Sequence, residues 1–321
     1  MMKQLAILFT CLVCNTIVKA QQSSQYSLHA YNPYFLNDAF NGIRSEIDLT
    51  AGFRKQWVGL NGSPLQFYFS SHMSLNNINS GIGLAAEYDQ IGTFTHINTK
   101  LTYSYIFKIN QVKLSIGPGL RINTSFINGE AIITPTGNYE NPIDHNDPIL
   151  PTGLRSNTSF GINGSIYVYH EMFESGVSVI NINNPSIDLS PSFQFQNGRY
   201  IHANLLFKIP ITDEIKIKPS VFFRSDLIQS QIDFITRASY QDRFEFGIGF
   251  RGYTTPSVDA VIIMAGMQIT DQLMCAYAYD ISVGALQGFN SGSHELVIRY
   301  RIDNKLFKPL PHKIIYNTRY F

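Results

Sequence analysis

The segment "SGSHEL" brings serine, histidine and carboxylate side chains together near the C-terminal end of the 321-residue sequence. Its residue types are those of a serine hydrolase, with Ser291, Ser293, His294 and Glu295, and Asp280 upstream. A serine nucleophile needs a base within hydrogen-bond reach and a third group that orients this base. Neighbouring residues of a β-strand point to opposite faces, so His294 and Glu295 would make poor catalytic partners on a strand. We therefore expect no catalytic residues and no enzyme activity.

A second cluster of potential ligands lies in a proline-rich segment and contains Glu140, Asp144, His145 and Asp147. Carboxylates and imidazole bind divalent cations, so the cluster could hold one. A solvated loop has the same composition, and we favour this interpretation. The sequence predicts neither a metal site nor a cofactor.

The first twenty residues have the pattern of a secretory signal peptide. Lys3 supplies the positive charge, Leu5–Val13 is apolar, and Val18–Ala20 is a small-residue cleavage site. A short membrane anchor is the alternative, but a spanning helix needs about 20 apolar residues. Cleavage would leave Cys275 as the only cysteine, which excludes an intramolecular disulfide and a cysteine metal cluster.

The composition narrows the class of protein further. Hydrophobic residues make up 44% of the chain and charged residues 15%, and the formal net charge is +1. This balance gives no reason to expect nucleic acid as a partner. After residue 20, no apolar run reaches the length of a spanning helix. An exported, aromatic-rich chain of this kind fits a transmembrane β-barrel, which also satisfies every backbone polar group in lipid.

Apolar residues alternate with glycine, serine, asparagine and charged residues in many segments, for example Lys113–Asn123, Ser159–Tyr169 and Phe244–Arg251. Period-two alternation predicts strands with one apolar face, and a soluble β-sandwich would show it too. Many segments reach the length of about ten residues that a tilted spanning strand needs. The candidate strands are 46–57, 64–74, 81–90, 93–108, 112–125, 127–134, 156–169, 172–182, 199–210, 214–225, 230–240, 243–253, 258–269, 273–282 and 293–301. Bacterial barrels have even counts, so we predict about 14 antiparallel strands and expect one short segment not to span.

The chain divides into four predicted regions: a signal peptide (1–20), an N-terminal luminal segment (21–45), the barrel (46–301) and a periplasmic tail (302–321). Proline-rich loops at 135–155 and 182–198 are predicted to lie outside the cell. The luminal segment contains Gln25–Gly42, which is aromatic, almost uncharged and unlike a strand. A disordered leader is the alternative to a plug inside the barrel. Glycines on the predicted lumen faces would allow a plug to approach closely or relieve curvature strain; they are Gly81, Gly83, Gly117, Gly119, Gly161, Gly247 and Gly249.

The segment "FRKQWVGLNGSP" contains the only tryptophan, Trp57. Alternation from Ile47 places Arg54 in the lumen, within possible reach of carboxylates at Asp48, Glu245, Asp280 and Glu295. Trp57 and Lys55 then lie at the membrane boundary, where tryptophan often anchors a barrel. A contact with a partner protein is the alternative role for this segment.

Several motifs, in the same order along the chain, resemble the PorP/SprF-like outer-membrane proteins of the type IX secretion and gliding system. The stretches "YNPYFLNDAFNG" (Tyr31–Gly42) and "RKQWVGLNGSP" (Arg54–Pro64) are similar to the family's opening and its most recognisable motif, although Asp38 stands where proline is common. Further matches are "GIGLAAEYDQIG" (Gly81–Gly92), "YSY" (Tyr103–Tyr105), "KPS" (Lys218–Ser220), "FGIGFR" (Phe246–Arg251), "YAYD" (Tyr277–Asp280), "SGSHEL" (Ser291–Leu296) and "NTRYF" (Asn317–Phe321).

The resemblance implies a non-enzymatic protein of the outer membrane that supports type IX export or holds an exported adhesin on the cell surface. Its implied partners are outer-membrane lipid, the adhesin and periplasmic components of the secretion machine. A pore or uptake channel is the alternative, because it would have the same fold. The candidate structural or partner-contact residues are Asn32, Pro33, Arg54, Gln56, Trp57, Gly59, Asp89, Gly92, Tyr279, Asp280, His294 and Glu295.

Overall fold

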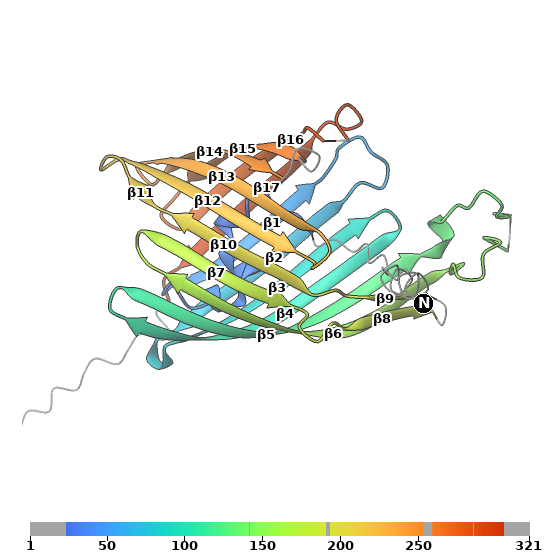
Figure 1. Cartoon of the computed structure of the whole chain (residues 1–321), viewed down its shortest axis with the longest axis horizontal. Coiled ribbons are helices and arrows are strands. Elements are labelled where there is room, and N and C mark those ends of the chain that lie inside the picture. Colours follow the sequence, from blue (N-terminus) through green and yellow to red (C-terminus); the bar gives the residue numbers. More distant parts are fainter. Residues whose placement is uncertain (1–23, 141, 191–192, 253–258, 285, 305–321) are drawn as a thin grey trace, which may run out of the picture.

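The computed structural model of the chain describes residues 24–140, 142–190, 193–252, 259–284 and 286–304, and Figure 1 shows them as a barrel of tilted strands. The predicted signal peptide and nearly all of the predicted tail lie outside the described residues. The strands are β1 (Ile47–Lys55), β2 (Leu65–Leu75), β3 (Ser80–Ile91), β4 (Phe94–Ile109), β5 (Val112–Asn128), β6 (Leu154–Tyr169), β7 (Phe173–Ile180), β8 (Ser186–Ser190), β9 (Phe193–Gln196), β10 (Tyr200–Phe207), β11 (Ile209–Pro210), β12 (Ile215–Ser225), β13 (Ser230–Tyr240), β14 (Phe244–Arg251), β15 (Ala260–Gln268), β16 (Leu273–Ser282) and β17 (Ser293–Ile302).

One antiparallel sheet closes on itself to form the barrel. β1 pairs with β17, with Lys55 opposite His294, and β10 pairs with β12, with Ile201 opposite Ser225. β11 continues β10, and β8 and β9 form a separate hairpin, so the described chain contains a closed barrel of 14 strands. This confirms the predicted fold and strand count and excludes two stacked sheets. Among the described residues, no helix is long and apolar enough to cross a membrane.

Two local predictions were wrong. The predicted strand at 127–134 does not exist, because β5 ends at Asn128 and a 3-10 helix, η4 (Gly129–Ala131), follows it. Asn128 accepts a hydrogen bond from the amide of Glu130 and starts this helical turn. The predicted loop at 182–198 contains the β8–β9 hairpin, in which Ile187 lies opposite Phe195. Pro185 immediately precedes β8, and its carbonyl accepts a hydrogen bond from the amide of Asn197, so this proline does not prevent pairing.

The two faces of the barrel wall differ as the alternation predicts. On β5, Leu120 is 63% exposed on the outer face, while Ser115 and Asn123 on the inner face are buried. The same contrast separates the exposed Phe67 and Phe69 of β2 from its buried inner residues. The apolar side chains therefore face the hydrocarbon of the membrane and the polar side chains line the lumen.

Leu120→Arg in the middle of β5 is expected to destabilise the barrel by about 2–4 kcal/mol, because the charge would lie in hydrocarbon. The measurement is the free energy of unfolding in lipid vesicles by urea titration. Ile133→Arg is the matched control, since Ile133 is 80% exposed in a loop beyond the strands. Equal effects of the two substitutions would contradict the assignment of the outer face to lipid.

The lengths of the connections orient the barrel. At one end, each connection has at most four residues, as between β4 and β5. At the other end, residues 129–153 join β5 to β6, and the β8–β9 hairpin lies between β7 and β10 (Figure 1). Outer-membrane barrels have short periplasmic turns and longer external loops. The end with short turns therefore faces the periplasm.

Candidate functional site

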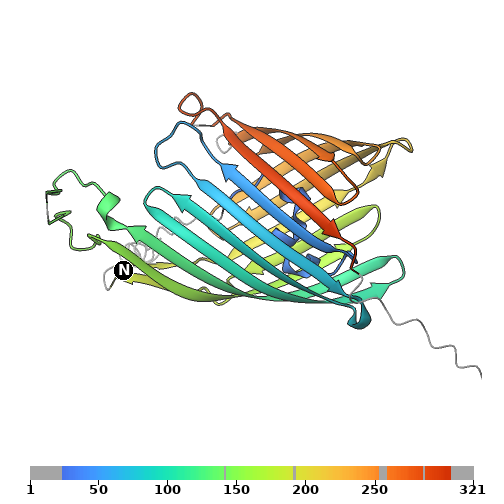
Figure 2. The same cartoon turned by 180° about the vertical axis from the view of Figure 1, so that it is seen from behind.

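An N-terminal segment lies inside the barrel. Residues 24–43, called the plug below, contain η1 (His29–Tyr31), α2 (Pro33–Leu36) and η2 (Asp38–Phe40), and Figure 2 shows these helices within the ring of strands. Every residue of the plug is buried or half-buried. The plug begins near the extracellular end, where Ser24 Oγ donates to Asp89 at 2.8 Å. It ends near the periplasmic end, where Lys113 Nζ donates to the carbonyl of Ile43 at 2.7 Å. Residues 24–43 of the predicted luminal segment 21–45 therefore lie inside the barrel.

The pair Asn32-Pro33 begins helix α2. Asn32 Oδ1 accepts a hydrogen bond from the amide of Phe35 at 3.3 Å, and Pro33 fills the first helical position, where a missing N–H costs nothing. Asn32 Nδ2 also donates to Ser70 Oγ on β2 at 2.9 Å. One side chain therefore caps the helix and connects it to the barrel wall.

Asn32→Ala is expected to weaken docking of the plug by about 1 kcal/mol, the usual cost of a lost helix cap. Hydrogen–deuterium exchange of residues 24–43 is the measurement, and a several-fold faster exchange is expected. Asn77→Ala, in an exposed periplasmic turn, is the control and should leave this exchange unchanged.

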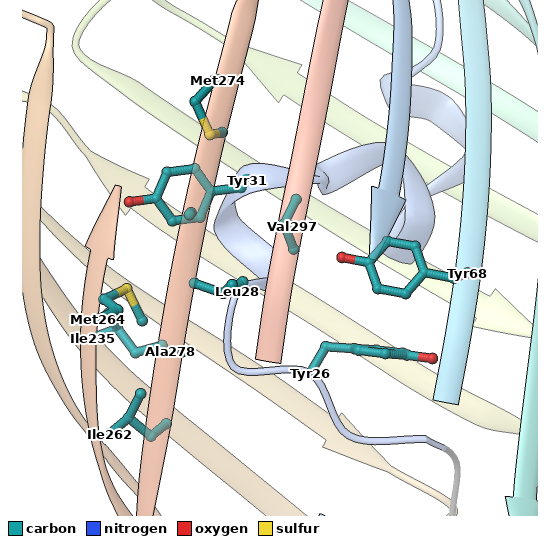
Figure 3. Packing of buried hydrophobic residues seen from close by; sticks show 11 residues of the cluster. Tyr26, Leu28, Tyr31, Tyr68, Ile235, Ile262, Met264, Met274, Ala278 and Val297 are labelled. Carbon is teal, nitrogen blue, oxygen red and sulfur yellow. The ribbon is translucent and has the colours of Figure 1, made fainter. Parts of the chain in front are cut away.

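Apolar side chains of the plug pack against the wall. Figure 3 shows Tyr26, Leu28 and Tyr31 of the plug beside Tyr68 and Val297 of the wall. The rings of Tyr26 and Tyr68 are 4.8 Å apart in an edge-to-face arrangement. Such aromatic pairs stabilise beyond the area that they bury.

His29 adds a neutral ring to this packing. Its imidazole lies 4.8 Å from the ring of Phe222 on β12. Burial lowers the pKa of His29 to about 4, so the ring carries no charge at neutral pH. This part of the plug is therefore held by packing without a charged histidine.

Arg54 lies in a buried charge network that joins the plug to the wall. Its Nη2 is 2.7 Å from Asp280 Oδ2, and its Nη1 is 3.0 Å from Glu295 Oε2. Ser27 of the plug completes the network, because its Oγ donates to Asp280 at 2.7 Å and its amide donates to Glu295 at 2.6 Å. Arg251 contacts Asp280 at 2.8 Å and donates to Ser27 Oγ at 2.8 Å. Charges from β1, β14, β16 and β17 thus converge on one serine of the plug.

The structure brings together two of the four carboxylates that the sequence offers to Arg54. Asp48 instead lies 3.9 Å from Arg299, and Glu245 pairs with Lys218 and Arg237. The closure of the barrel brings Asp280 and Glu295 to Arg54, because β1 pairs with β17 and β17 pairs with β16.

A second anchor was missed by sequence analysis. Lys100 on β4 places Nζ 2.6 Å from Asp38 Oδ1 and donates to the carbonyls of Tyr34 and Phe35 at 2.9 and 3.1 Å. Asn163 donates to the other oxygen of Asp38 at 2.9 Å. One signal was available: Asp38 is the only acidic residue of the plug, and it stands where the family commonly has proline.

Glycines on the wall allow the plug to approach its backbone. A Cβ atom on Gly81 would lie 2.5 Å from the carbonyl carbon of Asn41, and one on Gly117 would lie 2.6 Å from Cα of Ala39. Both distances are shorter than real Cβ contacts, so a larger residue would displace the plug. The plug thus explains four of the seven luminal glycines, namely Gly81, Gly83, Gly117 and Gly119, whereas Gly161, Gly247 and Gly249 face other parts of the wall.

The loop between β1 and β2 lies at the extracellular end. Trp57 is half-buried, follows the end of β1 and donates its amide to Ser293 Oγ at 3.1 Å. Gly59 has φ +98°, which favours glycine. Gly92 forms the β3–β4 turn and donates its amide to the carbonyl of Gly62 at 2.8 Å. These residues connect neighbouring extracellular loops and lie outside the plug.

The remaining candidates divide between the lumen and the outer face. Gln56 Nε2 donates to Gln25 Oε1 of the plug at 3.2 Å. On the other face, His294 Nδ1 lies 2.6 Å from Tyr277 Oη, and Tyr279 Oη donates to a backbone carbonyl of the neighbouring loop. His294 and the buried Glu295 therefore point to opposite sides of the wall.

The cluster around His145 uses its polar atoms within the loop. His145 is buried, and its Nε2 lies 3.1 Å from the carbonyl of Pro151. Asp144 and Asp147 accept backbone amides two residues further on at 2.8 and 2.9 Å. Within the described ranges, no group of three or more His, Cys, Asp and Glu residues is placed to hold a metal ion.

A closed 14-stranded barrel with an apolar outer face and an anchored plug defines an outer-membrane β-barrel protein. Residues 18–300 match the family described as "Type IX secretion system membrane protein PorP/SprF". The chain belongs to this family, as the motifs predicted, and its location is the outer membrane.

Solved structures share the fold at low sequence identity. A FadL homologue of Pseudomonas aeruginosa is 10% identical with a TM-score of 0.50, covering 85% of this chain and 93% of its own. Two further structures are less similar. The toluene transporter TbuX of Ralstonia pickettii is 8% identical with a TM-score of 0.48, covering 84% of this chain and 92% of its own. Omp33 of Acinetobacter baumannii is 7% identical with a TM-score of 0.47, covering 82% of this chain and 100% of its own. The first likeness supports the barrel fold and nothing further. No curated protein matches the sequence.

Proposed function

We propose that this protein is a non-enzymatic component that supports type IX secretion or holds an exported surface protein, such as an adhesin, at the outer membrane. Family membership supports a place in the secretion system. The carrying observation is the plug, which is fixed to opposite walls through Ser27 and Asp38. A barrel filled in this way is suited to holding a partner rather than to passing solutes.

The extracellular loop 56–64 and the neighbouring turn at Gly92 are our candidates for contact with the exported protein. Loops at this end face the space into which such a protein emerges, and tryptophan is enriched at protein interfaces. The luminal candidates, Arg54 and its partners, serve instead to position the plug.

The direct test is affinity purification of the tagged chain from native outer membrane, followed by mass spectrometry. We expect a large exported surface protein and periplasmic components of the secretion system to be recovered, and an unrelated barrel from the same membrane to recover neither. Recovery of the barrel alone would count against attachment.

Trp57→Ala is expected to weaken binding of the surface protein about thirtyfold and to lower its recovery accordingly, since a central interface tryptophan often contributes about 2 kcal/mol or more. Phe289→Ala, in another extracellular loop and strongly exposed, is the matched control. Unchanged recovery with Trp57→Ala would leave Trp57 with the role of a membrane anchor.

The second candidate is a pore or uptake channel. The observation that favours it is the presence of cavities on both sides of the plug, of about 490 and 80 Å³. A channel would conduct ions when the purified protein is placed in a planar bilayer.

A further inference from the structure

The larger cavity, called the vestibule below, lies inside the barrel between the plug and the periplasmic end. Its volume is about 490 Å³, within the range of about 300–1,000 Å³ that is usual for ligand sites. Among the described residues, nine basic and four acidic side chains line it. The chain as a whole is nearly neutral, so this excess is local.

Each acidic residue of the vestibule is already paired with a basic one. Glu174 lies 2.6 Å from Lys208, and Glu46 lies 3.7 Å from Arg301. The other two pairs are Asp242 with Lys216, and Glu245 with both Lys218 and Arg237. Arg299 also lies 3.9 Å from Asp48 of β1, so the wall neutralises only part of the basic excess.

Several basic side chains of the vestibule are still able to bind an acidic group. Within the described chain, Arg44, Lys113 and Arg243 form no ion pair. The side chain of Arg237 is only 5% exposed, and its Nε has no hydrogen-bond partner among the described residues. A buried donor without an acceptor costs free energy, which a carboxylate ligand would recover.

The position of the vestibule limits what could fill it. Lipid lies against the apolar outer face, while the vestibule opens into the lumen among charged side chains. The chain's own residues 305–321 come after β17 in the sequence, but they contain four lysines and arginines and no aspartate or glutamate. A segment of that charge is a poor match for a basic cavity. A negatively charged peptide segment would match the basic lining, and it could enter the vestibule from the periplasmic end of the barrel.

We infer that the vestibule binds an acidic peptide segment of a periplasmic partner protein. This inference rests on the proposed function, since it names the chemistry of one partner. Carboxylate side chains would contact Arg44 and Arg243 at the entrance and Arg237 further in. Binding of this kind weakens as salt concentration rises.

The test uses the full chain in detergent and a fluorescent hexaglutamate peptide, with hexaglutamine as the neutral probe, followed by fluorescence anisotropy. We expect hexaglutamate to bind and hexaglutamine not to bind. The double variant Arg44→Gln/Arg243→Gln should raise the Kd by about tenfold or more, since charge-assisted contacts are lost. Arg155→Gln/Arg199→Gln, at two exposed extracellular positions, removes the same charge and should not change it. If the double variant has a lower melting temperature, the single variant Arg243→Gln is measured in its place and should also raise the Kd.

Five outcomes decide the inference. Equal binding of the two peptides, or equal loss in both double variants, would overturn it. Complete displacement of hexaglutamate by phosphatidylglycerol micelles at low concentration would also overturn it, in favour of a lipid headgroup site. Peptide binding without co-purification of a surface protein would support the vestibule and reject attachment. Co-purification without peptide binding would reject the vestibule alone.

Discussion

Arg54→Ala is expected to release the N-terminal half of the plug from the barrel wall. The substitution leaves Asp280 and Glu295 in the lumen with one cation fewer, and both carboxylates are almost completely buried. Removing one partner of a buried ion pair typically costs about 3–5 kcal/mol. The loss should appear mainly in the plug, because the barrel strands keep all of their backbone pairing.

Hydrogen–deuterium exchange resolves this local effect. Amides of residues 24–31 should exchange at least a hundredfold faster in Arg54→Ala, the factor that corresponds to about 3 kcal/mol, while β1 and β17 keep their protection. Arg155→Ala, at an exposed extracellular position, is the control. Unchanged protection of the plug would refute the role assigned to Arg54.

Lys100→Met is expected to release the second half of the plug by a comparable amount. Lys100 is the cation paired with Asp38 and donates to two carbonyls of α2, so its removal leaves the buried carboxylate with Asn163 but without its counter-charge, and it removes the donor from both carbonyls. The expected cost is about 3–5 kcal/mol. Lys108→Met, at an exposed position of the same strand, is the control.

A double variant separates the charge effect from lost packing. Lys100→Met/Asp38→Leu removes both charges and should be less destabilising than Lys100→Met alone, since an apolar pair can replace a buried ion pair at little cost. The measurement is exchange of amides 34–43. Additive effects of the two substitutions would mean that the two residues do not interact.

The sequence alone predicted the barrel because its signal is local. Alternation with period two is visible within a single strand such as β5, and it also placed Arg54 on the inner face. The same reasoning predicted a strand at 127–134 that does not exist, because a short apolar run there follows the long strand β5. It also missed the β8–β9 hairpin, because proline density was taken to exclude pairing throughout the loop.

Contacts across the lumen were beyond sequence reasoning. Lys100 and Asp38 are 62 residues apart, and their contact depends on the path of the plug through the closed ring. The vestibule has the same origin, since its basic residues come from separate strands and turns that carry only one or a few each. No charge run marks it in the sequence.

The central claim, that an anchored plug closes the barrel, is tested most directly by ion conductance in planar bilayers. The purified wild-type protein is compared with Arg54→Ala/Lys100→Met, in which both anchors are lost. The expected result is no conductance steps from the wild type and clear steps from the double variant. Steady conductance of the wild type at the level of the double variant would contradict the claim and favour a channel.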